Sequence, residues 1–232
     1  MNYAIIAAGE GSRLQAEGVK ASKPMVTVGG EALIDRLLRI FRRMKAEHID
    51  VIVNPQMPEV VNHLRAAETA SDDLSVYVQS TPSSMHSLAV LADHLPPSPF
   101  CLTTVDTIFR EDDFAAYIAA FDSMEVDALM AVTAYVDDEK PLYVATDARL
   151  NITAFNDAHH GETYVSAGIY LLRPEILTTL RLCIAEGQSR MRNFQRALLA
   201  DGWRVKAYPM SKVLDIDHAT DIAKAEAFLA AT

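Results

Sequence analysis

The hydrophobic and polar residues of the first half of the chain follow two alternating patterns. Short apolar runs, typical of strands buried on both faces, alternate with segments whose apolar residues recur every three or four positions, as in amphipathic helices. The apolar runs cover residues 3–8, 49–53, 74–78 and 100–105. The helical patterns cover residues 33–44, a stretch opening at Pro58, residues 84–95 and a stretch opening at Glu111. This alternation predicts an α/β fold with a doubly wound, mostly parallel, Rossmann-like sheet and helices on both faces.

The pattern changes after Asp127. Four strand-like runs, at 128–135, 142–146, 152–155 and 164–172, follow one another with only turns between them. Helical patterns at 174–182 and 190–200, a strand at 204–208 and a last helix ending at 229 complete the chain. We therefore expect a small antiparallel lobe, an insertion or extension that forms a second layer over one side of the sheet. Because no repeat or low-complexity linker divides the chain, we expect one domain, 1–232, with lobes of about 1–125 and about 126–232.

Composition narrows the classes of partner. With 232 residues, half of them hydrophobic, the chain can bury a core of its own. Its formal net charge of −10 argues against a nucleic-acid or anionic-membrane surface, since either would need a basic face. There is no signal-peptide pattern and no apolar run long enough to span a bilayer, and Cys101 and Cys183 have the apolar surroundings of buried, reduced thiols. We expect a soluble, cytoplasmic protein that acts on small molecules, and homo-oligomerisation stays open.

The first apolar run ends in a glycine loop that predicts phosphate binding. Gly9 and Gly11 follow the run, and Arg13 and Lys23 supply two cations. A dinucleotide-binding loop would have a third glycine where Leu14 stands, and an acidic residue near the position of Lys23. The Gly-Lys-Ser/Thr ending of a P-loop is also absent. What remains is a loop whose backbone N–H groups can hold phosphate beside two positive charges.

The run Ala7-Ala8-Gly9-x-Gly11-x-Arg13-Leu14, followed by Lys23-Pro24, resembles the nucleotidyltransferases that join a nucleoside triphosphate to a sugar phosphate or an alcohol phosphate. The resemblance covers essentially the whole chain. It implies nucleotide contacts at Ala8, Gly9, Gly11 and Ser12, with backbone amides on the phosphates. It also implies that Arg13 and Lys23 are catalytic, since they would neutralise charge on the α-phosphate and on the departing pyrophosphate.

Two aspartates are the candidate metal ligands. Asp106 follows the apolar run 100–105, at the sheet edge where doubly wound folds bind ligands. Asp217 precedes the last helix, where it could equally be an N-cap. The resemblance implies that both hold Mg²⁺, a cation that suits sites with few carboxylates. Asp215 would point the same way as Asp217 if the segment is extended, so it could contribute or support.

The base-binding end departs from the sugar-phosphate branch of the family, which carries Gly-Thr-Ala before its helix. The stretch from Gln79 to Leu88 instead resembles the Ser-Leu form of cytidylyltransferases, including the phosphocholine type. On this resemblance Gln79, Ser84 and Ser87 are candidate nucleotide contacts, although the serines could also cap the helix. The base therefore stays open between cytosine and uracil.

The acceptor end is expected at Asp157, Tyr164, Gly168 and Lys212. The segment 164–170 resembles the family's Asn-x-Gly-Ile-Tyr strand, which lines the acceptor pocket. The family also uses a lysine from a Glu-Lys-Pro triplet, but Lys140 in such a triplet precedes the expected strand and is interpreted as a surface residue. Lys212, close to Asp217, is the better candidate for the acceptor phosphate.

Together these residues predict a Mg²⁺-dependent enzyme that joins the nucleoside monophosphate of CTP or UTP to a sugar 1-phosphate or a phosphorylated alcohol and releases pyrophosphate. Two alternatives stay open. A glycosyltransferase of related fold would carry Asp-x-Asp after the middle strand, where only Asp106 stands. A nucleotide-binding regulatory module without catalysis would not need the complete set of two cations and two carboxylates.

Overall fold

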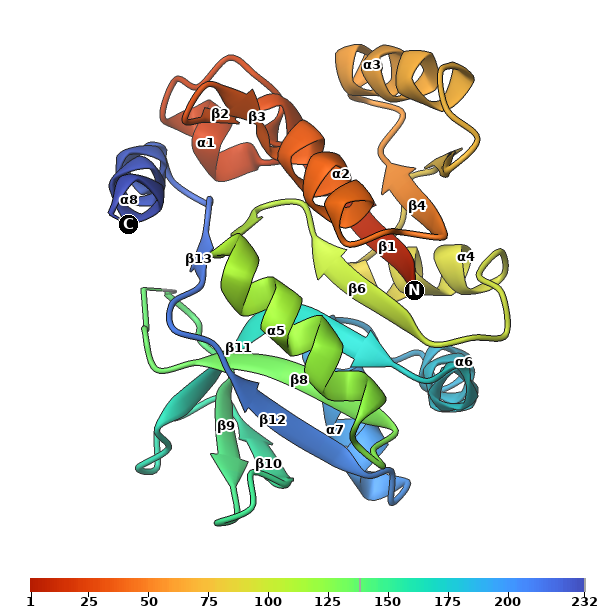
Figure 1. Ribbon diagram of the computed structural model, residues 1–232, viewed down its shortest axis with the longest axis vertical. Helices are drawn as coiled ribbons and strands as arrows, with labels where there is room; N and C mark the ends of the chain where they lie inside the picture. Colours follow the sequence, from red (N-terminus) through yellow and green to blue (C-terminus); the bar gives the residue numbers. More distant parts are fainter. Residues whose placement is uncertain (138, 232) are drawn as a thin grey trace.

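A nine-stranded sheet with helices on both faces organises the protein. The computed structural model describes residues 1–137 and 139–231. The four parallel strands come from the first half of the chain and lie in the order β5 (Leu74–Val78), β4 (His48–Val53), β1 (Asn2–Ala7) and β6 (Phe100–Thr104). Strand β1 lies between β4 and β6, with Ile5 opposite Val51 on one side and Thr103 on the other. This confirms the doubly wound, mostly parallel sheet (Figure 1).

The second half of the chain extends the same sheet with antiparallel pairing. Strand β11 (Tyr164–Leu172) runs antiparallel to β6 and also to β8 (Ala128–Thr133). Strand β12 (Val205–Pro209) lies outside β8 and parallel to it. The first residues of β11 pair with β9 (Tyr143–Thr146), which forms an antiparallel pair with β10 (Ile152–Asn156). The antiparallel strands are therefore continuous with the parallel sheet rather than a separate layer over it.

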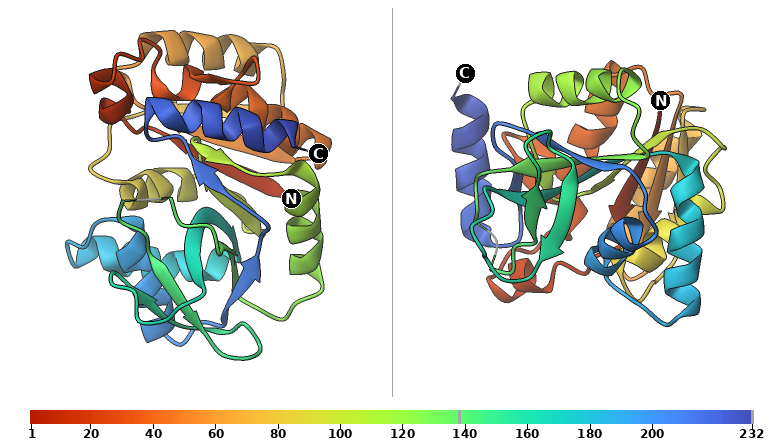
Figure 2. Two further views of the ribbon diagram at one scale, coloured as in Figure 1. Left: turned by 90° about the vertical axis from the view of Figure 1, so that its left-hand side faces the viewer. Right: turned by 90° about the horizontal axis from the view of Figure 1, so that it is seen from below.

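Seven helices of nine to twelve residues within the described ranges cover the two faces, and the five-residue α1 (Ser12–Ala16) adds a short turn beside the first loop. One face carries α2 (Leu33–Arg43), α3 (Pro58–Thr69), α5 (Glu111–Asp122) and α8 (Ala219–Ala230). The other face carries α4 (Ser84–Ala92), α6 (Leu177–Ala185) and α7 (Met191–Ala200). Seen from below, α2 and α5 lie on one side of the strands and α6 and α7 on the other (Figure 2).

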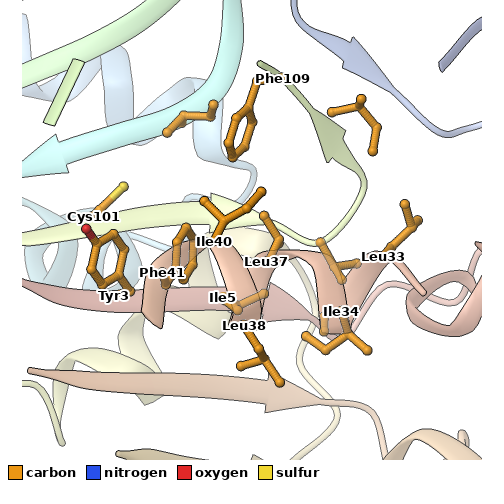
Figure 3. Packing of buried hydrophobic residues seen from close by; sticks show 14 of the residues in the cluster. Tyr3, Ile5, Leu33, Ile34, Leu37, Leu38, Ile40, Phe41, Cys101 and Phe109 are labelled. Carbon is orange, nitrogen blue, oxygen red and sulfur yellow. The ribbon is translucent and has the colours of Figure 1, made fainter. Parts of the chain in front are cut away.

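Strand β1 shows why both faces are apolar. Its odd residues Tyr3, Ile5 and Ala7 belong to one buried cluster and its even residues Ala4 and Ile6 to the other, because successive side chains of a strand point to opposite faces. On the first face the ring of Tyr3 stacks on Phe41 with centroids 4.2 Å apart (Figure 3). A continuous apolar run was the expected signature of a strand buried in this way.

Helix α2 follows its predicted pattern with one exception. Leu33, Ile34, Leu37, Leu38 and Phe41 are buried as expected. Arg36, one of the polar residues between them, is buried too, and its Nη2 donates to the carbonyl of Phe109 at 2.9 Å. Burial of an arginine is tolerated where its donors find acceptors, and this one ties α2 to the segment after β6.

Several boundaries differ from the expectation. Strand β8 ends at Thr133, helix α4 ends at Ala92, and helix α6 is preceded by a 3₁₀ turn, η2 (Pro174–Ile176). Four strands of two residues were not predicted, because two residues are too few to show a period. They are β2 (Thr27–Val28), β3 (Glu31–Ala32), β7 (Thr107–Ile108) and β13 (Leu214–Asp215), and η1 (Lys23–Met25) is a further unpredicted turn.

Candidate active site at the carboxyl edge of the sheet

A two-residue ladder brings together residues that are far apart in the sequence. Strand β7 pairs antiparallel with β13, so that Thr107 lies opposite Asp215 and Ile108 opposite Leu214. The backbone N–H of Ile216 extends the ladder by donating to the carbonyl of Asp106 at 3.1 Å. Asp106 and Asp217 flank this ladder. The pairing therefore places the two predicted metal ligands side by side at the carboxyl end of β6.

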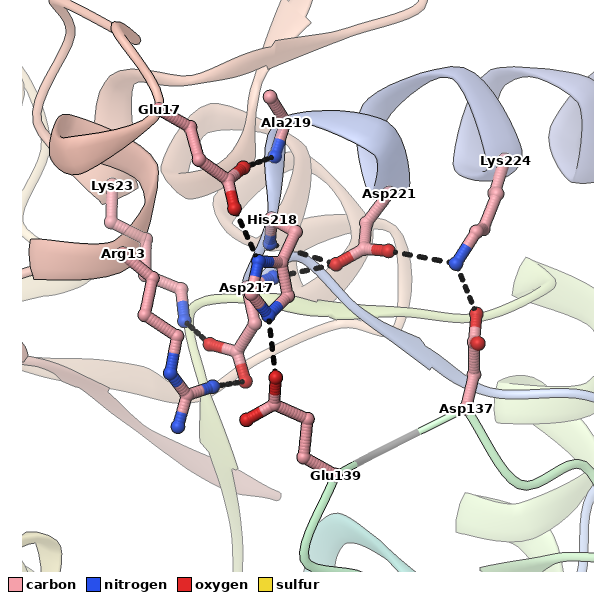
Figure 4. Close-up of polar contacts among 10 residues, drawn as sticks. All are labelled: Arg13, Glu17, Lys23, Asp137, Glu139, Asp217, His218, Ala219, Asp221 and Lys224. Atoms are coloured by element: carbon pink, nitrogen blue, oxygen red, sulfur yellow. Dashed lines mark hydrogen bonds and ion pairs between the residues drawn. The ribbon is translucent and has the colours of Figure 1, made fainter.

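Lys23 joins the two carboxylates. Its Nζ contacts Oδ2 of Asp106 and donates to Oδ1 of Asp217 at 2.7 Å. The other oxygen of Asp217 accepts from Nη1 of Arg13 at 2.9 Å (Figure 4). The two predicted catalytic cations and the two predicted metal ligands thus form one ion cluster, which we call the Lys23 cluster. Its members are Arg13, Lys23, Asp106 and Asp217.

Burial and charge oppose each other inside the Lys23 cluster. The Lys23 side chain is only 10% exposed, and burial by itself would lower its pKa. The carboxylates of Asp106 and Asp217 outweigh burial and raise the pKa of Lys23 instead. Burial would likewise raise the pKa of Asp106, but the charge of Lys23 and a hydrogen bond from Thr104 leave that pKa below its ordinary value. Lys23 is therefore an ammonium and Asp106 a carboxylate at neutral pH.

The glycine loop holds Lys23 close to the first strand. Gly11 has a φ of +63° and is the residue before α1. A Cβ added to Gly11 would lie 2.9 Å from the Cβ of Lys23, closer than side-chain carbons approach one another. Glycine is thus required at this position for two reasons, backbone conformation and contact with Lys23. Ser12 and Arg13 begin α1 and are exposed.

Asp106 has a supporting network on one side and an unpaired oxygen on the other. Oγ1 of Thr104 and Oγ1 of Thr107 are 2.9 Å apart. A β-bulge in β11 lets Gly168, at a φ of +71°, pass over both hydroxyls, and an added Cβ would lie 3.5 Å from each. Oδ1 of Asp106 is buried without a hydrogen-bond partner among the described residues. A buried carboxylate oxygen without a partner is costly unless a ligand completes it.

One side of the Lys23 cluster opens into a cleft of about 340 Å³, within the usual range for ligand sites. Ala8, Gly9, Lys23 and Asp106 line it, together with the predicted contacts Ser84 and Ser87. Gln79, also predicted here, lines a neighbouring groove between α4 and α6 instead. We call the first cavity the nucleotide-side cleft.

Sequence reasoning missed several residues of the nucleotide-side cleft, namely Asn54, Ser80, Thr81, Ser83 and Thr104. Asn54 directly follows β4 and is buried, with its Nδ2 3.5 Å from the carbonyl of Ala8. A signal for it was present, because a polar residue after a buried parallel strand lies at the same edge as Asp106. Thr81 bonds Ser87 through their hydroxyls at 2.6 Å, so the predicted serine is held in place by a residue that was not predicted.

A second pocket lies on the other side of Asp217, and we call it the acceptor-side pocket. Its walls come from the segment after β8, from β11 and from the start of α8. Arg13, Tyr135, Glu139, Ser166, Asp215, Asp217 and His218 are among its lining residues. His218 hydrogen-bonds Glu17, a contact that raises the pKa of His218 and lowers that of Glu17. Glu17 also accepts from the N–H of Ala219 at 2.7 Å, which ties the first loop to α8 (Figure 4).

The predicted acceptor residues are only partly brought together. Gly168 lies at the bulge beside Thr107, and Lys212 places its Nζ 3.9 Å from the ring centroid of Tyr135, which lines the acceptor-side pocket. Asp157 is instead paired with Arg192 and, at 2.8 Å, with Arg196 of α7.

Two neighbouring predictions complete the acceptor side. Tyr164 packs against the core on the face of α4, α6 and α7, and is not among the residues that line the pocket. Lys140, interpreted as a surface residue, is exposed in the bend before β9.

The carboxylates of the Lys23 cluster suit Mg²⁺. Lys23 shows that a single cation can contact both, and the unpaired Oδ1 of Asp106 offers a further oxygen donor. Within 1–137 and 139–231 no group of three histidine, cysteine or acidic side chains is arranged for a metal. Two carboxylates still fit, because Mg²⁺ is commonly held by one or two carboxylates together with substrate phosphates and water.

The comparison with family models settles the class of protein. The model of the MobA-like NTP transferase domain matches residues 3–194. The chain belongs to this family. It is therefore an enzyme of the nucleotidyltransferase type, and family membership weighs against both a glycosyltransferase and a module without catalysis. Asp217 lies beyond the matched residues, so its place in the site rests on the ladder between β7 and β13.

Similar proteins include several nucleotidyltransferases. The chain is 26% identical over 188 residues to the N-acetylmuramate alpha-1-phosphate uridylyltransferase of Caulobacter vibrioides, covering 74% of this chain and 75% of that protein. A Bacillus anthracis protein assigned as a glucose-1-phosphate thymidylyltransferase, in complex with sucrose, has a TM-score of 0.85 at 20% identity over 100% of this chain and 96% of its own. The inositol-1-phosphate CTP transferase of T. maritima has a TM-score of 0.79 at 16% identity, over 97% and 96%. The two structures show a shared fold.

Proposed function

We propose that the enzyme transfers the nucleoside monophosphate of CTP or UTP to a sugar 1-phosphate or a phosphorylated alcohol, with Mg²⁺, and releases pyrophosphate. The family supports nucleotidyl transfer, and the names of the three similar proteins combine uridylyl, thymidylyl or cytidylyl donors with phosphorylated small molecules. A cytoplasmic location is part of the proposal. It agrees with the finding that no described helix is long and apolar enough to cross a membrane.

One observation carries the proposal: the Lys23 cluster lies between two cavities. Lys23 and Asp106 line the nucleotide-side cleft, while Arg13 and Asp217 line the acceptor-side pocket. The ion pair between Lys23 and Asp217 connects the two sides. An arrangement of this kind suits a reaction in which two phosphorylated substrates meet at one charged centre, each approaching from its own side.

In the proposed reaction an oxygen of the acceptor's phosphate forms a bond to the α-phosphorus. The bond from that phosphorus to the bridging oxygen breaks, and pyrophosphate leaves with the electron pair. The protein forms no covalent bond with either substrate. Lys23 and Arg13 offset the negative charge on the α-phosphate and the leaving group, and the loop at Gly9 and Gly11 presents backbone N–H groups to the phosphates.

Asp106 and Asp217 would hold Mg²⁺, which would supply charge neutralisation and a fixed orientation of the phosphate oxygens. The hydroxyl of Thr104, which is itself hydrogen-bonded to that of Thr107, helps to orient Asp106. Ser84, Ser87 and Asn54 are proposed to contact the nucleotide. Gly168 and Lys212 are proposed to serve the acceptor, with Lys212 reaching it from the ring of Tyr135.

The test is a matrix of substrates with pyrophosphate release as the readout. CTP, UTP, ATP, GTP and dTTP are each combined with sugar 1-phosphates, inositol 1-phosphate and phosphocholine, with Mg²⁺ or with EDTA. We expect one pyrimidine triphosphate and one acceptor class to give turnover that EDTA abolishes. Turnover with none of the pairs, in a preparation that is folded, would contradict the proposal.

Two matched controls accompany the matrix. Asp72→Asn changes an exposed aspartate in the loop before β5, and Lys206→Ala changes a partly exposed lysine of β12. Both should leave turnover unchanged, whereas Lys23→Ala should lower it.

A further inference from the structure

The Lys23 cluster is electrically complete without any ligand. Its two carboxylates and two cations sum to zero formal charge, and both oxygens of Asp217 and one oxygen of Asp106 are in contact with a cation. The residues that would hold a metal are therefore the same residues that hold the cations meant for the triphosphate. A metal held by both carboxylates, or a phosphate held by both cations, therefore has to separate an existing pair.

We propose that Lys23, with Arg13, is an internal counter-cation that keeps Asp106 and Asp217 from binding a divalent metal until a nucleoside triphosphate draws the two cations away. Metal and triphosphate then bind with strong positive coupling, and each binds poorly alone. This inference rests on the proposed function, because it concerns the same site and the same two ligands.

The cost of entry for the metal alone follows from the burial of Lys23. A divalent cation on Asp106 and Asp217 would put a like charge beside the ammonium, whose side chain is only 10% exposed. Lys23 would have to stay, facing the metal, or lose both of its carboxylate partners in a partly dry site. A buried charge without a partner is strongly unfavourable.

Binding of the triphosphate alone is unfavourable because it would leave anions, rather than a cation, without a partner. If its phosphates take Lys23 and Arg13, the two aspartates remain as neighbouring anions beside a polyanion. Asp106 already has one buried oxygen without a partner, so the loss of Lys23 would leave the whole carboxylate uncompensated. With both ligands present, every charge finds an opposite charge: the carboxylates face the metal and the cations face the phosphates.

A metal that merely bridges protein and phosphate would also bind better with nucleotide, so Lys23 must be tested separately. Simple bridging predicts that the carboxylates are open to metal at all times and that removing Lys23 weakens binding of the metal–nucleotide pair only. The counter-cation model predicts opposite effects of one substitution. Loss of Lys23 should strengthen binding of the metal alone and weaken binding of the metal–nucleotide pair.

The first experiment uses the unmodified protein. Binding of Mn²⁺ alone is followed by the loss of the free-ion signal in electron paramagnetic resonance, and binding of CTP and UTP is measured by calorimetry with EDTA and with Mg²⁺. The affinity of each metal for the free nucleotide is measured in the same buffer, and the binding constants of the protein are corrected for it. We expect a coupling of at least about 100-fold, near the upper end of common coupling strengths.

The second experiment compares Lys23→Gln with the matched control Lys206→Gln. Lys23→Gln should raise the affinity for Mn²⁺ alone by about 10-fold or more, which is about 1.4 kcal/mol, and lower the affinity for Mg²⁺ with CTP or UTP. Lys206→Gln should change neither. Arg13→Gln, a substitution at an exposed side chain, should act in the same two directions and more weakly.

The outcomes separate the two proposals. Saturable binding of Mn²⁺ alone below millimolar concentration in the unmodified protein overturns the counter-cation model and leaves the function intact. Weaker binding of the metal–nucleotide pair in Lys23→Gln and Arg13→Gln, with no gain in affinity for Mn²⁺ alone, does the same, since Lys23 would then be a phosphate ligand only. If no nucleoside triphosphate binds even with Mg²⁺, the proposed function fails and the inference with it.

Discussion

Asp50 lies in the middle of β4 and Asp106 just past the end of β6, and each has one buried carboxylate oxygen without a hydrogen-bond partner in the described part of the chain. Burial raises the pKa of Asp50, which accepts a hydrogen bond from the hydroxyl of Tyr77 at 3.0 Å. The pKa of Asp106 is lowered, because Lys23 outweighs burial. Two buried acids of the same sheet thus have opposite pKa shifts, and the difference is the cation held against Asp106.

The largest expected difference is in catalysis. Asp106→Asn should lower kcat/KM by about 10²–10³, the usual effect of removing one electrostatic group from a reacting centre. Asp50→Asn, the same chemical change in the same sheet, should keep near-normal turnover. Pyrophosphate release at saturating Mg²⁺ and nucleotide measures both. Equal losses in the two variants would show that burial, which the two acids share, and not the cation beside Asp106, accounts for the loss.

The next largest effect concerns the two cations of the Lys23 cluster, Lys23 and Arg13. Lys23→Met removes the 10% exposed cation and should lower the free energy of unfolding by about 3 kcal/mol, because Asp106 is left buried without its partner. Arg13→Met removes a 48% exposed cation and should cost no more than about 1 kcal/mol. Urea unfolding followed by circular dichroism gives both values. If Arg13→Met costs as much as Lys23→Met, burial of the pair is irrelevant.

A smaller effect tests how the loop holds Lys23. Gly11→Ala should lower the free energy of unfolding by about 1–2 kcal/mol for its left-handed backbone and add strain against Lys23. Gly187→Ala is the matched control, since Gly187 has a φ of +74° and nothing within 4 Å of an added Cβ. Only the Gly11 variant should also lose turnover. Equal behaviour of the two variants would mean that Lys23 moves aside without consequence.

The smallest effect is the pH dependence of Asp50. An acid whose pKa is raised by folding favours the folded state at low pH and loses that contribution as the pH rises. Asp50→Asn should therefore have the higher melting temperature at pH 7. The gap should shrink toward pH 4, near the ordinary pKa of aspartic acid. Scanning calorimetry from pH 4 to 8 follows it, and a gap that widens on acidification would reverse the assignment of Asp50.

The sequence predicted the parts of this comparison that are local. Gly11, Arg13 and Lys23 lie within one short stretch, and Asp106 ends a buried run, so local patterns and the family resemblance were enough to single them out, and their roles stay predictions. The acceptor side depends on contacts between distant segments. Asp157 was predicted to contact the acceptor, yet α7 packs beside β10 and presents Arg192 and Arg196 to it. The spacing of apolar residues in the sequence does not indicate which face of a helix will pack against a carboxylate in a distant loop.

Asn54 and Asp217 show two further limits of predicting the site from the sequence. Asn54 follows its strand just as Asp106 does, so a consistent application of the edge rule would have found it. Asp217 was predicted from the resemblance, but its approach to Asp106 depends on β7 and β13, which are two residues each. Pairs that short carry no pattern, and only the folded chain shows them.

The ladder between β7 and β13 also affects the stage of synthesis at which the proposed active site can form. Every residue of the glycine loop and of the nucleotide-side cleft, Asp106 included, is made before residue 107, and the second carboxylate, Asp217, comes more than 100 residues later. A growing chain can therefore form most of the parallel sheet while the centre still lacks Asp217. The proposed catalytic arrangement is completed only when the segment that carries Asp217 has been made and has folded back onto the segment after β6.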